Sequence, residues 1–126
     1  MNSESELWDQ VWDILGYHAK GQATPQETLL RLIDEQFQVH LRQPIPADLA
    51  IEAMKPRREG WTTSDLDKLR RKRERTGVQG DRSQPIVVLR WSGQDFLIDG
   101  TRRINERVAQ QVEGTHPVIV LSVESG

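Results

Sequence analysis

The sequence contains no cysteine, and this absence excludes three kinds of chemistry. Disulfide bonds, zinc sites built on thiolates and cysteine nucleophiles all require a residue that the chain lacks. Histidine is also scarce: His18, His40 and His116 are far apart in the sequence and match no metal-binding motif. We therefore expect structural or surface roles for the three histidines, and no metal site.

Long apolar runs are missing as well. No stretch approaches the roughly 20 apolar residues that a membrane span needs, and the N-terminus lacks the basic-then-apolar pattern of a secretory signal. We expect a cytoplasmic protein without a membrane partner. The 126 residues, 36% hydrophobic and 29% charged, are typical of a globular chain with one modest core.

The net charge of −2 hides a difference between the two ends of the chain. Residues 1–50 hold 3 Lys and Arg against 8 Asp and Glu, whereas residues 51–126 hold 14 against 11. Residues 1–50 therefore carry a net charge of −5, and residues 51–126 a net charge of +3. This asymmetry favours an anionic ligand bound by the C-terminal part of the chain.

Two amphipathic helices are predicted within residues 1–46. Ser3 and Glu6 have the spacing of a capping box, and Thr24 followed by Pro25 and Glu27 marks a second helix start. Two helices joined by a short connection predict a helical hairpin. Its apolar stripe either packs on the rest of the protein or, with Trp8 and Trp12 on its flank, forms a surface for a protein partner.

The middle of the chain is rich in basic residues. A weak apolar alternation over residues 48–54 predicts a short strand, and residues 55–61 predict a basic loop that contains Arg57 and Arg58. Thr62 and Asp65 predict the start of a third helix. Its second half is either a solvated face or a patch that contacts nucleic-acid phosphates, and it comprises Lys68, Arg70, Arg71, Lys72, Arg73 and Arg75.

The stretch from residue 85 to 108 carries the clearest functional signal. Apolar residues 86–89, the turn residues 92–95 and apolar residues 96–98 predict two paired strands. The apolar period then becomes helical, so a strand ends and a helix begins near Gly100 and Thr101. Free backbone amides at a helix start form an anion site, and Arg102 and Arg103 follow immediately.

Several of these elements, taken in order, resemble the ParB/sulfiredoxin superfamily over about residues 48–123. The matching segments are Pro56-Arg57, Gly80-x-x-x-Gln84-Pro85-Ile86-Val87, Asp99-Gly100-Thr101-Arg102-Arg103 and Pro117-Val118-Ile119-Val120. The resemblance implies an α+β fold: a small mixed sheet flanked by helices over residues 47–126, preceded by the helical hairpin of residues 1–46. Independently of the resemblance, the near-continuous apolar run at residues 118–123 predicts a strand that is central in the sheet.

The chain departs from the family at two points. The ParB branch has glutamate, and the sulfiredoxin branch cysteine, where this sequence has Thr101. The missing cysteine excludes sulfinic acid reduction, and the missing glutamate removes a residue of ParB-like nucleotide hydrolysis. ParB partition proteins also continue into a helix-turn-helix domain after this region, so we expect no reading of a centromere site.

Gly100, Arg102 and Arg103 match the phosphate-binding element of the ParB branch. The resemblance and the helix start together predict a phosphate site at Gly100, Thr101, Arg102 and Arg103. We expect one arginine to face the ligand and the other to buttress the loop. Arg57 and Arg58 are either surface charges or a second phosphate clamp beside this turn. Catalysis is left open: Asp99 and Glu106 are weak candidates, and a nucleotide carrying Mg²⁺ is the cofactor that such chemistry would use.

Two classes of function follow. The first is a ParB-like module that binds nucleotide or nucleic-acid phosphate, with weak nuclease or nucleotidase activity as an option, in a DNA-related role of plasmid or phage type. The alternative is a non-enzymatic inhibitor or accessory factor that binds a protein partner through the hairpin. A small-molecule kinase is a third option, because some superfamily members phosphorylate amino acids.

Overall fold

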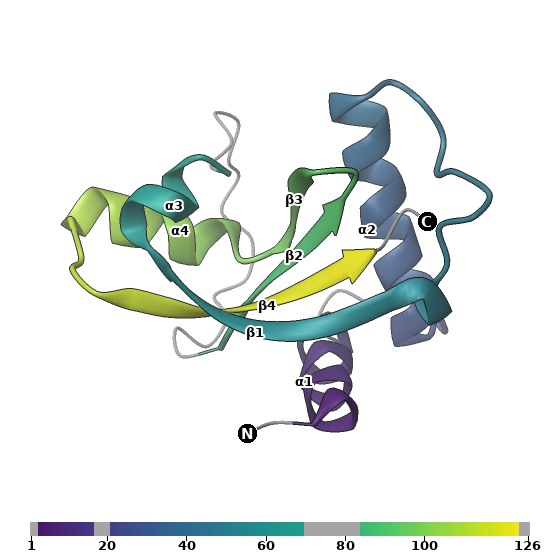
Figure 1. Ribbon diagram of the computed structural model, residues 1–126, viewed down its shortest axis with the longest axis horizontal. Helices are drawn as coiled ribbons and strands as arrows, with labels where there is room; N and C mark the ends of the chain where they lie inside the picture. Colours follow the sequence, from purple (N-terminus) through teal and green to yellow (C-terminus); the bar gives the residue numbers. More distant parts are fainter. Residues whose placement is uncertain (1–2, 17–20, 70–83, 124–126) are drawn as a thin grey trace.

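The computed structural model describes residues 3–16, 21–69 and 84–123. Within them the helices are α1 (Glu4–Gly16), α2 (Pro25–His40), α3 (Thr63–Asp67), α4 (Thr101–Gln110) and the short 3₁₀ helix η1 (Ile51–Ala53). The strands are β1 (Met54–Thr62), β2 (Ile86–Trp91), β3 (Gln94–Asp99) and β4 (Thr115–Val123). This arrangement confirms the predicted α+β class (Figure 1).

The strands form one mixed sheet in the order β1-β4-β2-β3. The central pair, β4 and β2, is parallel, and the outer strands pair antiparallel with them. Val118 to Leu121 of β4 are completely buried, which confirms the prediction of a central strand there. A two-residue turn at Ser92 and Gly93, both with positive φ, joins β2 to β3.

Helices cover both faces of the sheet (Figure 1). Side chains alternate along each strand, so Val87, Leu89 and Ile119 belong to the core cluster that includes α1 and α2. Their neighbours Val88 and Val120 belong to the second cluster, with α3 and α4. The two predicted helices of the N-terminal segment therefore pack on the sheet, as the first of the two alternatives requires.

Both N-terminal helices begin where the sequence predicts. The Thr24 hydroxyl accepts a hydrogen bond from the Glu27 amide at 3.1 Å, and the Glu27 carboxylate accepts one from the Thr24 amide at 3.0 Å. Ser3 Oγ accepts from the Glu6 amide at 3.2 Å. These bonds satisfy amides that the first helical turn leaves without an intrahelical acceptor.

The prediction for residues 48–61 is wrong. The structure places the 3₁₀ helix η1 at Ile51–Ala53 and runs strand β1 through the predicted basic loop. The strand accommodates Pro56 because β1 is an edge strand, where a missing backbone donor need not interrupt the sheet. The exposed charges of Lys55, Arg57 and Arg58 also suit an edge, since charged side chains discourage pairing with other chains.

The third predicted helix starts correctly and ends early. Thr62 and Asp65 form both bonds of the capping box. The helix ends at Asp67, where the Leu69 amide bonds back to the Leu66 carbonyl at 2.9 Å in a tighter turn. Lys68 is exposed just beyond it. Arg70, Arg71, Lys72, Arg73 and Arg75, the rest of the predicted basic patch, lie outside the described residues.

Candidate functional site

The predicted strand-to-helix junction is present between β3 and α4. Gly100 is buried there with φ of +124°, a conformation that side chains rarely adopt. A Cβ atom at this position would lie 2.6 Å from Ile86 Cγ1, which is too close for real atoms. Glycine is therefore required at residue 100 both by the backbone turn and by the close approach of β2.

Helix α4 begins without a side-chain cap. The first backbone bond of the helix runs from the Ile104 amide to the Gly100 carbonyl at 3.0 Å. The amides of residues 101–103 precede it, and the glycine N-cap offers no side-chain oxygen to accept from them. The positive end of the helix dipole lies at the same place. Thr101 and Arg102 are half-buried in this first turn, and Arg102 has an interaction partner within the fold.

Arg103 buttresses the junction. Its Nη1 donates to the backbone carbonyls of Gln84 at 3.0 Å and Pro85 at 3.3 Å, and its Nη2 donates to Asp99 Oδ2 at 2.5 Å. The Arg103 and Asp99 side chains are 12% and 10% exposed. One side chain thereby joins the chain entering β2 to the end of β3 and the start of α4.

The two weak catalytic candidates are both engaged in the fold. Asp99 directs its carboxylate at Arg103 in the ion pair just described. Glu106 is half-buried on α4 and has an interaction partner. Within the described residues, no group of three or more His, Cys, Asp or Glu side chains could hold a metal ion. A catalytic role for Asp99 or Glu106 stays a prediction.

His116 joins the same hydrogen-bond network from β4. Its Nε2 lies 3.1 Å from the Gln84 carbonyl, which also accepts from Arg103. Burial lowers the pKa of His116, and the nearby positive charges of Arg107 and Arg103 lower it further, while the Gln84 bond acts in the opposite direction. The imidazole is thus neutral near pH 7 and donates to Gln84, a structural role in line with the expectation from sequence.

Arg57 and Arg58 are not beside the Gly100–Arg103 turn. Residues Asp99, Val87, Ile119 and Arg58 follow one another across the four strands, so β2 and β4 separate Arg58 from the junction. Three strand spacings amount to about 14 Å. Arg58 instead donates to Gln10 of α1 at 3.1 Å, and Arg57 is exposed on β1.

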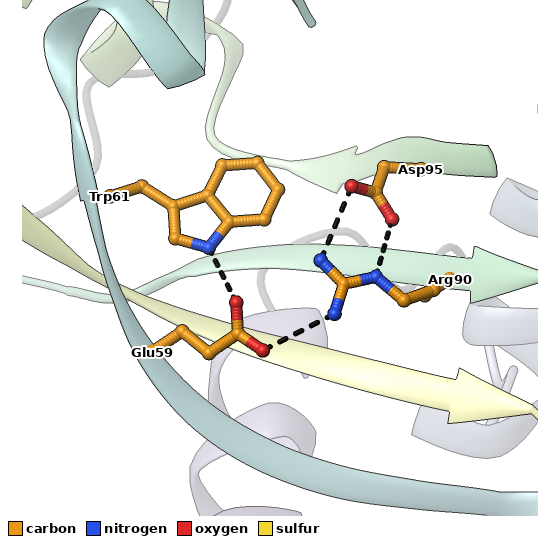
Figure 2. Close-up of polar contacts among 4 residues, drawn as sticks. All are labelled: Glu59, Trp61, Arg90 and Asp95. Carbon is orange, nitrogen blue, oxygen red and sulfur yellow. Dashed lines mark hydrogen bonds and ion pairs between the residues drawn. The ribbon is translucent and has the colours of Figure 1, made fainter. Parts of the chain in front are cut away.

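A polar network that the sequence reasoning missed lies where β1, β2 and β3 carry charged side chains (Figure 2). Arg90 donates to both carboxylate oxygens of Asp95, at 2.8 and 3.3 Å, and to Glu59 at 3.2 Å. Trp61 Nε1 donates to the other oxygen of Glu59 at 2.9 Å. These bonds, with Asp95 contributing most, raise the pKa of Arg90.

The Asp95 half of this network was detectable from sequence. The Ser92-Gly93 turn fixes the pairing of β2 with β3, and that pairing sets Arg90 directly opposite Asp95. The bond between Glu59 and Arg90 was not detectable from sequence, because the pattern of residues 55–61 predicts a loop. The guanidinium of Arg90 has two carboxylate partners, so this network holds the strands together and is a poor anion site.

Trp8 and Trp12 lie half-buried on α1, next to its buried stripe. Their rings stack with centroids 4.8 Å apart and planes 15° apart. Both residues also pack against the core cluster shared by α1, α2 and the sheet. The predicted partner-surface residues therefore form a single aromatic unit that is partly open to solvent.

A scan against protein-family models, a search of curated proteins and a search of solved structures found no match to this chain. The ParB/sulfiredoxin resemblance thus stays a prediction drawn from the motifs. In the ranges 3–16, 21–69 and 84–123, every helix is too short or too polar to cross a membrane.

Proposed function

We propose that this protein is a phosphate-binding module whose site is the first turn of α4. The observation that carries the proposal is the buried, positive-φ Gly100, which starts the helix against β2 without a side-chain cap. The resemblance to ParB-like Gly-x-Arg-Arg turns points to the same residues. The ligand class is a nucleotide or a nucleic-acid phosphate.

The roles within the turn follow from the chemistry of its groups. The amides of residues 101–103 point toward the N-terminal end of the helix and donate to phosphate oxygens. Thr101 adds a hydroxyl donor, and Arg102 adds positive charge in the same turn. Arg103 is a positioning residue: its bonds to Asp99 and to two carbonyls hold the turn in shape before a ligand arrives.

The proposed function is phosphate binding and does not include catalysis. Phosphoryl transfer needs carboxylates that hold Mg²⁺, and Asp99, the carboxylate that adjoins the turn, already accepts from Arg103. This donor set does not fit a protein-held Mg²⁺, so we derive no catalytic step. An ion carried by a nucleotide would be held by the nucleotide's own phosphates.

Titration calorimetry tests the proposal with inorganic phosphate, a nucleotide panel and a short DNA duplex. We expect at least one probe to bind, and Arg102→Gln to weaken that binding about tenfold, the value of one charge-assisted hydrogen bond. Arg31→Gln is the matched control. It removes the same charge from α2, in a pair with Glu35, and should leave binding unchanged.

Two results would contradict the proposal. The first is no heat of binding with any of the three kinds of probe at low salt. The second is equal weakening by Arg102→Gln and Arg31→Gln, which would mean that only the net charge of the protein matters.

A further inference from the structure

Helix α1 combines stacked tryptophans with a strong negative charge. Its sequence carries four acidic residues, Glu4, Glu6, Asp9 and Asp13, and no basic one. The buried stripe of the helix comprises Leu7, Val11, Ile14 and Leu15. Trp8 and Trp12 lie at the border of this stripe, where they pack against the core cluster and stay half-buried.

The geometry of α1 places acidic residues beside the tryptophans. With 100° per residue, Trp8 and Trp12 lie on one side of the buried stripe, and Asp9 and Asp13 follow on the solvent side of the rings. Both aspartates are exposed, whereas the rings are half-buried. Asp9 is three positions before Trp12, and Glu4 is four positions before Trp8, so each indole has an acidic residue as a neighbour on the helix surface.

We propose that this face of α1 is a docking site for a basic, arginine-bearing peptide segment of a partner protein. Trp is the best aromatic partner for a cation, and a guanidinium can stack on an indole while its edge bonds to a carboxylate. Tryptophan and arginine are also the residues most enriched where interfaces bind tightly. The charge of α1 selects a cationic partner, and the rings favour arginine over lysine.

The ring pair is suited to this role because it is already ordered. Stacking at 4.8 Å fixes both indoles against each other and against the core, so little side-chain freedom is lost when a partner binds. The site is independent of the α4 turn. The two sites lie on opposite sides of the sheet, because α1 packs on the face that α4 does not cover (Figure 1).

Tryptophan fluorescence of the full chain tests the proposal with three peptides of equal length, rich in arginine, lysine or glutamate. We expect binding of the arginine peptide, about threefold weaker binding of the lysine peptide, and none of the glutamate peptide. Trp12→Leu should weaken arginine-peptide binding about tenfold. The double variant Asp9→Asn, Asp13→Asn should weaken it several-fold, and both effects should persist in the Arg102→Gln background.

The double aspartate variant keeps the test valid if Trp12→Leu fails to fold, because Asp9 and Asp13 are exposed. A control is Glu35→Gln, which removes one exposed carboxylate from α2 instead of α1. The proposal is overturned if the arginine peptide does not bind or if the aspartate variants and Glu35→Gln behave alike. Sedimentation showing that the Trp pair instead joins two copies of this chain would also overturn it.

Discussion

Asp99 and Arg103 form an ion pair across the start of α4, one helical turn apart and both almost withdrawn from solvent. The same guanidinium binds the carbonyls of Gln84 and Pro85, at the entry to β2. Two segments that are distant in sequence are thereby fixed at one point. The shape of the proposed phosphate site depends on this pair, although neither side chain need touch a ligand.

Replacing Arg103 by alanine should lower the free energy of unfolding by about 3 kcal/mol, because the nearly buried Asp99 carboxylate loses the Arg103 guanidinium and the carbonyls of Gln84 and Pro85 lose the bonds that it donates. Urea unfolding measures the change. Arg31→Ala, which breaks the exposed pair with Glu35, should cost no more than about 0.5 kcal/mol. Similar losses in the two variants would show that Arg103 does not buttress the junction.

Gly100→Ala should be strongly destabilising. The added methyl group meets Ile86 at 2.6 Å and the backbone keeps φ of +124°, so we expect a loss of about 2–4 kcal/mol in thermal or urea unfolding. Gly93→Ala is the control: that glycine also has positive φ, but its Cβ would meet nothing within 4 Å. Equal losses of stability in the two variants would show that the close approach of Ile86 does not require glycine at residue 100.

Stability should fall as the pH is lowered from above 6.5, the ordinary pKa of a histidine, to below it. His116 has a lowered pKa in the folded state, so the unfolded chain binds a proton first as the pH passes below 6.5. Proton binding therefore favours unfolding as the pH falls below 6.5. Well above 6.5 the imidazole is neutral in both the folded and the unfolded protein, and the effect vanishes. Urea midpoints across this range should show a slope that His116→Gln reduces. An unchanged slope in the variant would refute the assignment to His116.

Arg90→Ala should cost about 1–2 kcal/mol, because it leaves the carboxylates of Glu59 and Asp95 without their shared cation. The expected loss of unfolding free energy is moderate because the three side chains are 27–34% exposed and water screens the interactions between their charges. The loss should shrink at high salt, as measured by urea unfolding with added NaCl. A loss that salt does not change would mean that packing, not charge, gives Arg90 its role.

Much of the fold was predictable because its signals are local. Thr24 with Glu27 and Thr62 with Asp65 mark helix starts by side-chain bonds within one turn. The apolar run at residues 118–121 marks a central strand, and Gly100 marks the junction where a helix replaces a strand. Each of these features depends on residues that are adjacent or a few positions apart.

The features that the sequence predicted wrongly or did not reveal involve residues whose partners are distant in sequence. Pro56 and the charged residues around it predict a loop. This segment is a strand because β1 pairs with β4 at the edge of the sheet. The same pairing decides that Arg58 contacts α1 and stays apart from Arg103. The Glu59–Arg90 bond spans 31 positions, so no local pattern could reveal it.

Amide NMR can show directly whether the first turn of α4 binds phosphate. ¹⁵N-labelled protein would be titrated with inorganic phosphate, with nucleotides and with a short DNA duplex. We expect saturable chemical-shift changes centred on the amides of Thr101, Arg102 and Arg103, and none in the amides of α2. Shifts that are absent from residues 101–103, or that spread evenly over the basic surface, would contradict it.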